Sequence, residues 1–166
     1  LTLTGSVTAD DLNYQVGLGL TWKADKNVAH GTFTLTDVSD AFTVDVVLAD
    51  RTDSPNTWDG SSLRKEGDGT LTLSAANTYS GKTGVAGGTL AAGAQNVFAQ
   101  SEAVSIEAGA RLALNGYNQA ANNLSGAGDI ALGAAALTAR YSEEETLSGT
   151  ISGTGRLVKE GAETLI

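Results

Sequence analysis

Short apolar pairs recur along this 166-residue chain at intervals of about twenty residues. Within a pair the apolar residues alternate with polar ones, as in Leu71-Thr72-Leu73 and Val104-Ser105-Ile106. Alternation with a period of two gives a β-strand one inward and one outward face. A repeat of this length that contains short strands is typical of a solenoid, in which each coil buries its apolar face only against its neighbours. The sequence therefore predicts an all-β fold, a parallel β-helix.

A longer echo accompanies this rhythm. The segment 63–71 is repeated at 157–165, 94 residues further on (157 against 63), and Lys65, Glu66 and Gly67 recur as Lys159, Glu160 and Gly161. The second copy stops at the last residue of the chain. We therefore expect a solenoid truncated at both ends, which is part of a longer array.

The composition agrees with a thin, turn-rich core. The chain has 21 Gly and 1 Pro, and hydrophobic residues make up 41% although aromatics contribute only 5%, so the interior must consist mainly of Val, Leu, Ile and Ala. Glycine and asparagine supply the positive φ angles that tight corners need. We expect such corners at 67–69, 87–88, 115–116 and 126–128.

We interpret residues 1–166 as a single β-helical segment in two parts. Residues 1–62 form less regular coils with a protruding loop near 50–60, and residues 63–166 form the repeat-bearing coils. The first part contains three longer strand patterns with aromatics, at 17–22, 31–36 and 41–48. The Ala-rich stretch 131–139 is the best helical candidate, but Gly133 interrupts it, and its place in the rhythm favours a coil of the solenoid.

Charge and cysteine content exclude several kinds of chemistry. A net charge of -9 and a pI near 4.4 argue against nucleic acid as a partner, because affinity for phosphates depends on Lys and Arg. The absence of cysteine removes disulfides, thiolate nucleophiles and Cys-based zinc sites. No run approaches the roughly 20 apolar residues of a membrane-spanning helix.

One segment carries a resemblance to a known family. The run LRKEGDGTLTLSAANTYSGKTGVAGGTL at 63–90 resembles the passenger-associated transport repeat of autotransporters, and GTGRLVKEG at 153–161 is similar to the opening of another copy. Ala75, Lys82 and Gly84 depart from the usual Gly, Gly and Thr, at positions that we expect at corners or on the outside. Residues 20–22 and 30–35 are similar to the AIDA-type self-associating adhesin subgroup.

The resemblance implies a right-handed β-helix at the surface of a Gram-negative cell, anchored in the outer membrane through a C-terminal translocator barrel. It also implies adhesion, aggregation or biofilm formation, with other copies or a host surface ligand, protein or glycan, as partner. One alternative is an autochaperone or stem segment that promotes passenger folding during secretion. Another is a polysaccharide-active enzyme, because β-helices host lyases and hydrolases.

No combination of residues in the sequence predicts an active site. His30-Gly31-Thr32 resembles the histidine motif of subtilisin-like proteases, but no Gly-Thr-Ser segment supplies a nucleophile. A single histidine also cannot form the multi-histidine clusters of catalytic zinc. The Gly-rich segment 149–155 is not a phosphate loop, because no Lys-Ser or Lys-Thr follows it.

The remaining candidates have an ordinary structural interpretation beside a functional one. Paired carboxylates can act as general acid and base, although in turns they are more often solvated; they lie at Asp10 and Asp11, at Asp50 and Asp53, and at Glu143, Glu144 and Glu145. Trp22, Trp58 and Tyr117 are potential glycan-stacking platforms, although packing is the commoner role. Outward Thr34, Thr36, Thr70 and Thr72 are expected to form ladders on a hydrated, adhesive wall, where the resemblance also allows glycosylation. We therefore predict no catalytic, cofactor-binding or metal-binding residue, no cofactor and no enzymatic activity.

Overall fold

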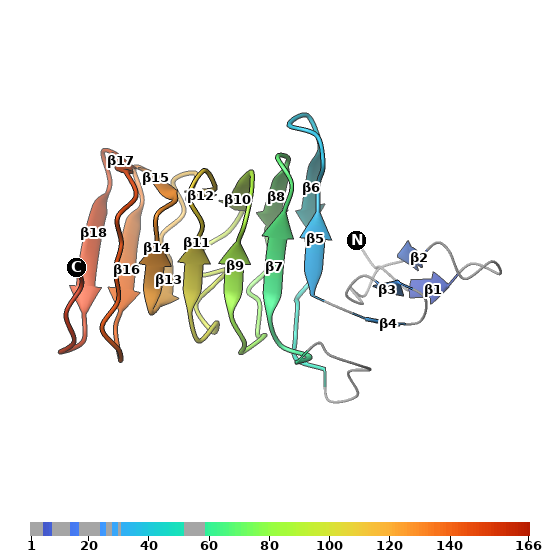
Figure 1. Ribbon diagram of the computed structural model, residues 1–166, viewed down its shortest axis with the longest axis horizontal. Helices are drawn as coiled ribbons and strands as arrows, with labels where there is room; N and C mark the ends of the chain where they lie inside the picture. The colour runs from blue at the N-terminus through green and yellow to red at the C-terminus, as the bar shows by residue number, and fades with distance from the viewer. Residues whose placement is uncertain (1–4, 8–13, 17–23, 26–27, 30, 52–58) are drawn as a thin grey trace.

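The computed structural model describes residues 5–7, 14–16, 24–25, 28–29, 31–51 and 59–166, with side chains from residue 31 onward. From residue 31 onward, the described residues consist of strands and turns and form a parallel β-solenoid of about five turns, which confirms the predicted fold class. Strands stack side by side from β5 and β6 at one end to β17 and β18 at the other (Figure 1). No helix that is long and apolar enough to span a membrane occurs among these residues.

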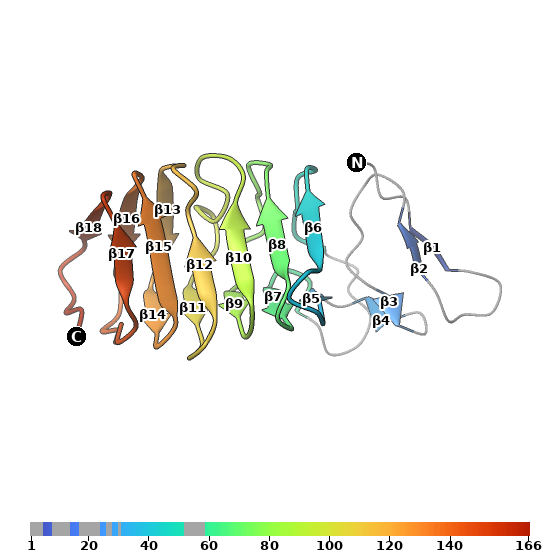
Figure 2. The same ribbon diagram turned by 90° about the horizontal axis from the view of Figure 1, so that it is seen from above.

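Three parallel sheets form the sides of the solenoid. The first contains β5 (Thr32–Thr34), β7 (Leu63–Glu66), β9 (Thr83–Val85), β11 (Val104–Ile106) and β14 (Leu124–Gly126). The second contains β6 (Ala41–Val44), β8 (Thr70–Leu73), β10 (Thr89–Ala92), β12 (Arg111–Ala113), β15 (Asp129–Gly133) and β17 (Ile151–Gly153). The third contains β13 (Gln119–Asn122), β16 (Ala136–Arg140) and β18 (Arg156–Glu160). From β5 to β12 the chain alternates between the first and second sheets, and from β13 onward it also visits the third. Figure 2 shows the second sheet along its whole length.

Two further pairs of short strands precede the solenoid in sequence. β1 (Gly5–Val7) pairs with β2 (Tyr14–Val16), and β3 (Ala24–Asp25) pairs with β4 (Val28–Ala29), in both cases antiparallel. The predicted strand at 17–22 lies outside the described residues. The other two strand patterns form β5 and β6, which join the first coil, although both strands are shorter than predicted. The second one ends at Val44 because the chain must turn there to bring Leu48 back into the core, where it is 1% exposed.

The strand register explains the rhythm of about twenty residues. Leu63 pairs with Thr83, twenty positions later, and Val104 pairs with both Thr83 and Leu124. Parallel strands lie about 4.8 Å apart, so residues one coil apart stack directly on one another. The result is a set of rows that run along the solenoid, each made of one residue per coil.

Inward rows of aliphatic residues make up the core. One row of the second sheet passes through all six of its strands, and every pair of neighbours is in register: Phe42, Leu71, Leu90, Leu112, Ile130 and Ile151. The four central members are fully buried. Because such burial contributes about 1.5–3 kcal/mol for each large aliphatic side chain, these rows are the main source of stability.

The corners of the coils lie at the glycine and asparagine residues where the sequence predicted them. Positive φ angles occur within all four expected corner segments. At Gly67, with φ of 74°, a Cβ atom would overlap the Leu35 carbonyl of the previous coil, so both the dihedral angle and the close stacking require glycine. Gly133, with φ of 61°, is the last residue of β15, and β16 begins at Ala136. The Ala-rich stretch is therefore part of a coil and not a helix.

Side-chain amides take the place of the third sheet where it has no strands. Asn77 is 3% exposed; its Oδ1 accepts a hydrogen bond from Leu48 N at 2.9 Å and its Nδ2 donates to Val97 O at 3.1 Å. Val97 N in turn donates to Oε1 of the buried Gln119 at 2.9 Å. These contacts link four successive coils. From Gln119 onward, backbone pairing of β13 with β16 takes over.

A buried hydroxyl network lies behind the corner between the third and first sheets. The Tyr79 and Thr83 hydroxyls lie 2.7 Å apart, Thr83 donates to Ser101 Oγ at 2.9 Å, and Ser101 donates to Gly81 O at 2.7 Å. Burial raises the pKa of Tyr79 to about 12, against a smaller lowering by the hydrogen bond to Thr83.

We expect the chain to lose stability in alkali because of Tyr79. Above pH 10 the unfolded chain releases the phenol proton while the folded chain keeps it, so the free energy of unfolding should fall by about 2–3 kcal/mol between pH 10 and 12. Urea unfolding at several pH values measures this fall. In the Tyr79→Phe variant the free energy of unfolding should fall less between pH 10 and 12. An equal fall in the variant and the original chain would contradict the assignment to Tyr79.

Candidate functional site

Several residues that the sequence singled out cannot be placed. Asp10, Asp11, Trp22, His30, Asp53 and Trp58 lie outside the described residues. The candidates that can be placed are Asp50, the three consecutive glutamates, Tyr117 and the threonines.

Asp50 holds a corner of the solenoid together. Its Oδ1 accepts a hydrogen bond from Ser80 N and its Oδ2 accepts one from Ser80 Oγ, both at 2.8 Å. Ser80 belongs to the next coil, so the carboxylate joins two coils. With both oxygens engaged, Asp50 has the geometry of a structural cap.

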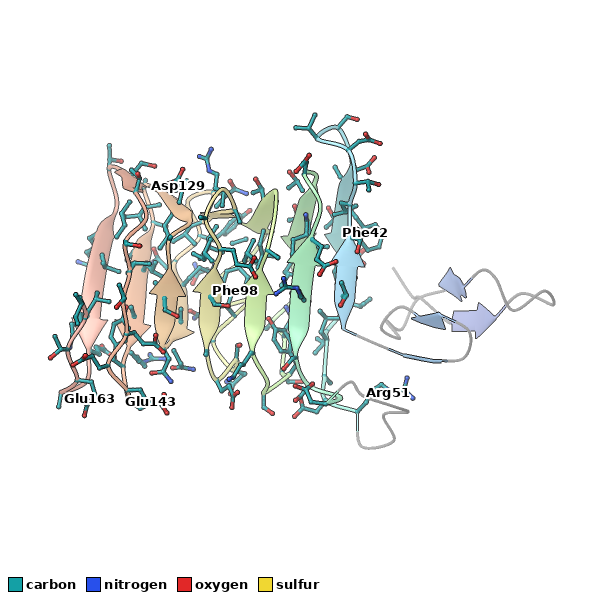
Figure 3. All side chains as sticks on the ribbon, viewed as in Figure 1. Phe42, Arg51, Phe98, Asp129, Glu143 and Glu163 are labelled. Atoms are coloured by element: carbon teal, nitrogen blue, oxygen red, sulfur yellow. The ribbon has the colours of Figure 1, made fainter. Side chains whose placement is uncertain are left out.

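The glutamates at 143–145 lie in the turn after Tyr141. Glu143 and Glu144 are exposed, and Glu145 is half-buried. In Figure 3, Glu143 and Glu163 project along one edge of the solenoid, and Asp129 lies at the opposite edge. Among the described residues, no group of three His, Cys, Asp or Glu side chains could hold a metal ion.

Charged side chains form a network on the outside of the first sheet. Arg64 Nε contacts Glu66 Oε1 at 2.8 Å, and Arg64 Nη2 contacts Glu107 Oε1 at 3.0 Å. Thr34 Oγ1 donates to Glu66 Oε2 at 3.4 Å. The hydrogen bonds that Arg64 donates to Glu66 and Glu107 raise the pKa of Arg64, and the one to Glu66 has the larger effect. The four residues, which we call the charged wall, span four coils and present both signs of charge to solvent.

Gly84 lies beneath the Arg64 side chain on the outside of the first sheet. It stands one coil after Arg64 in the same row, followed by Ser105, and the guanidinium passes over it toward Glu107. A Cβ at Gly84 would lie 3.7 Å from Arg64 Nη1 and 3.8 Å from Ser105 Oγ, which are ordinary contacts. The outward position confirms the expectation for Gly84, and exposed Lys82 agrees as well.

We expect Gly84→Ala to stabilise the solenoid by about 0.5–1 kcal/mol, because alanine reduces the freedom of the unfolded chain and fits the folded one. Thermal unfolding measures the effect as a higher Tm. Gly67→Ala is the matched control and should destabilise, since φ of 74° and the Leu35 carbonyl leave no room for a side chain. A lower Tm for Gly84→Ala would contradict the account of this row.

The threonines divide between two sheets. On the second sheet Thr70 pairs with Thr89 and Thr72 pairs with Thr43, which gives two short ladders on its outer face. Thr34 belongs to the charged wall, and Thr36 is exposed in the turn after β5. The predicted ladder therefore exists for Thr70 and Thr72, whereas Thr34 pairs in register with Glu66.

Lys65 is a buried cation that sequence reasoning did not identify. It is fully buried and lies in an inward row between Phe33 and Val85. Its Nζ donates to the carbonyls of Glu66 at 2.7 Å, Gly67 at 2.8 Å and Gly87 at 3.2 Å. Burial lowers the pKa of Lys65, against the opposing effect of the Asp68 and Glu66 charges. The alternation Leu63, Lys65 was the available signal, because it assigns both residues to one face.

Two open hollows lie at the corners of the later coils. One, of about 420 Å³, is lined by Glu102, Asn122, Asn123, Arg140, Tyr141, Ser142 and Glu143. The other, of about 340 Å³, is lined by Asn118, Ala134, Ala136, Thr154, Gly155 and Arg156. Tyr117, directly before Asn118, is 41% exposed, so it is available to a ligand and is not packed inside.

Comparison with known proteins gives a family match for one segment and a similar protein for a larger part of the chain. Residues 63–92 match the family model described as the passenger-associated-transport-repeat. Over 109 residues the chain is 41% identical to a protein named adhesin BmaC autotransporter, from Brucella suis biovar 1 (strain 1330). The aligned part covers 61% of this chain and 3% of that protein, so the chain spans a small fraction of its relative's length.

The described residues from 31 onward form a parallel β-solenoid, and one repeat of a known family lies within it. Residues 63–92 are a passenger-associated transport repeat within it, which confirms the resemblance that the sequence carried.

Proposed function

We propose that this chain is an adhesive, non-enzymatic segment of a passenger displayed at the bacterial surface. The observation that carries the proposal is the 41% identity with an adhesin autotransporter. The transport repeat at 63–92 adds to it, because that repeat belongs to passengers. In the whole protein, a translocator barrel in the outer membrane would hold the segment at the cell surface.

The outer surface of the solenoid suits adhesion in physical terms. Its outward residues form rows with a spacing of about 4.8 Å, so many weak contacts repeat along one rigid face. The charged wall offers donors and acceptors together, and the threonine ladders offer hydroxyls. A repeating polar face of this kind can engage another copy or a host ligand through many simultaneous contacts, which favours aggregation and biofilm formation.

A stem or autochaperone role is the second candidate, and the stacking of coils favours it. Asp50, Lys65 and Asn77 each hydrogen-bond to a neighbouring coil. A folded coil therefore presents ready-made partners to the next one, as a template for folding during secretion would.

One experiment separates the two roles. The full passenger is displayed on cells with and without residues 63–166, and surface exposure and cell aggregation are both measured. Adhesion predicts normal exposure with loss of aggregation. Loss of exposure or of protease resistance in the remaining passenger would select the stem role, and unchanged aggregation with normal exposure would contradict adhesion.

A further inference from the structure

The smaller hollow, which we call the corner hollow, lies where the second sheet gives way to the third. Asn118 comes from the fourth coil, Ala134 and Ala136 from the fifth, and Thr154, Gly155 and Arg156 from the last. Gly133 and Gly155 carry no side chain at this corner, and a Cβ at Gly155 would overlap the Ala135 backbone. The lining of the hollow therefore combines small residues with the polar side chains of Asn118, Thr154 and Arg156, which form what we call its rim.

The rim of the corner hollow is rich in hydrogen-bond donors. Asn118 Oδ1 accepts a bond from Ala136 N at 2.8 Å, whereas no acceptor for its Nδ2 lies within the described part of the chain. Thr154 Oγ1 donates to Gly133 O at 3.3 Å and keeps its lone pairs. Arg156 is exposed, and none of the described carboxylates forms an ion pair with it. No acidic residue lines the hollow.

The larger hollow has the opposite electrostatic character. Glu102 and Glu143 line it, and its arginine, Arg140, is paired with Glu160 at 3.1 Å. An anion would meet two carboxylates and a neutralised guanidinium there. In a chain with a net charge of -9, the corner hollow is thus a pocket whose one charged lining residue is an unpaired cation.

We propose that the corner hollow binds a carboxylated saccharide unit, which rests on the adhesive function proposed above and names its ligand class. Arg156 would hold the carboxylate through two parallel hydrogen bonds, a geometry that guanidinium groups favour. Asn118 Nδ2 and Thr154 Oγ1 would serve the ring hydroxyls. The hollow of about 340 Å³ is an open surface depression, so it would hold one sugar unit that stays in contact with solvent.

The test compares two probes that differ in the carboxylated sugar. Binding of 3′-sialyllactose and of lactose to the 166-residue chain is measured by calorimetry and by NMR shift perturbation at low ionic strength. We expect sialyllactose to bind and to shift the resonances of Asn118 and Arg156, and lactose to bind at least tenfold more weakly. Arg156→Gln should weaken sialyllactose binding by about ten- to hundredfold, as loss of a charged hydrogen bond does.

Arg140→Gln is the matched control, because it removes an arginine from the acidic hollow and should leave the affinity unchanged. Sodium sulfate is the second control, since competition at equal concentration would mean that the hollow takes any anion. Equal binding of lactose, no effect of Arg156→Gln, or an equal loss in Arg140→Gln would overturn the proposal. Aggregation that depends on residues 63–166 without sialyllactose binding would overturn this ligand alone. The absence of both sialyllactose binding and aggregation, with normal surface exposure, would contradict the adhesive function as well.

Discussion

Replacing Lys65 with alanine should lower the free energy of unfolding by about 3–5 kcal/mol. The change removes a fully buried stem from a core row and leaves the carbonyls of Glu66, Gly67 and Gly87 without the ammonium that now donates to them. A cavity and lost buried hydrogen bonds each cost on the order of 1–3 kcal/mol. Urea unfolding followed by circular dichroism measures the loss.

Lys159 provides the matched control for Lys65. It occupies the corresponding place in the echoed segment and its Nζ donates to Gly161 O at 3.0 Å, but it is exposed. Lys159→Ala should therefore cost about 1 kcal/mol or less, because water replaces the lost contacts. Lys65→Met keeps the stem and removes only the donor, so it should still cost about 2 kcal/mol. A methionine variant as stable as the original would show that the ammonium does not stabilise this corner.

Asn77→Leu should destabilise the solenoid by about 3–5 kcal/mol, the second large effect. It leaves Leu48 N and Val97 O buried without their present partners, and each such group costs about 1–3 kcal/mol. The leucine side chain also has to fit into the buried space of Asn77, which is 3% exposed. Because these bonds link successive coils, hydrogen exchange should accelerate at Leu48 and at its neighbours in the first coil.

Asn118 serves as the comparison for Asn77, because it is exposed but also accepts a hydrogen bond from the next coil. The distance from Ala136 N to Asn118 Oδ1 is 2.8 Å. Asn118→Ala should cost less than about 1 kcal/mol, since water can reach that amide. Similar losses for the two variants would mean that burial does not decide the contribution of these amides.

The fold was predictable because the spacing of the apolar pairs along the sequence equals the length of one coil. Leu71, Leu90 and Leu112 stand in one row of the second sheet, as their intervals of about twenty residues required. The amide links were not predictable, because Asn77 and Gln119 lie in segments without apolar alternation. A lone polar residue in such a segment looks the same whether it faces solvent or the core.

The two copies of the segment that repeats after 94 residues do not occupy equivalent places in the solenoid. Leu63 begins β7 in the first sheet, whereas Leu157 lies in β18 of the third sheet. The register explains this difference, because coil lengths vary: Leu90 pairs with Leu112 after 22 positions (90 to 112), and Leu112 pairs with Ile130 after 18 (112 to 130). Two copies of a motif can therefore fall on different sides of the solenoid. In both copies the lysine Nζ donates to the carbonyl of the glycine two positions after it.

The candidate site could be foreseen only in part. Tyr117 was a potential sugar platform by residue type, and the structure leaves it exposed. The corner hollow combines residues from three coils, so its members, Asn118, Thr154 and Arg156, are up to 38 positions apart (118 to 156). No local motif connects them, and the pairing state of Arg156 depends on which carboxylates the fold brings near it.

The central claim is that residues one coil apart stack in register, because every outward row and every proposed binding face depends on it. The chain has no cysteine, so a cysteine pair reports on this stacking without background. Ser105 and Ser125 are register partners on the outer face of the first sheet. A Ser105→Cys, Ser125→Cys variant should form a disulfide on mild oxidation, since parallel neighbours lie within bridging distance. A Ser105→Cys, Ala127→Cys variant, two residues out of register and beyond the limit of roughly 7 Å, should remain reduced. Equal oxidation of both pairs, or oxidation of the second alone, would contradict the solenoid described for this chain.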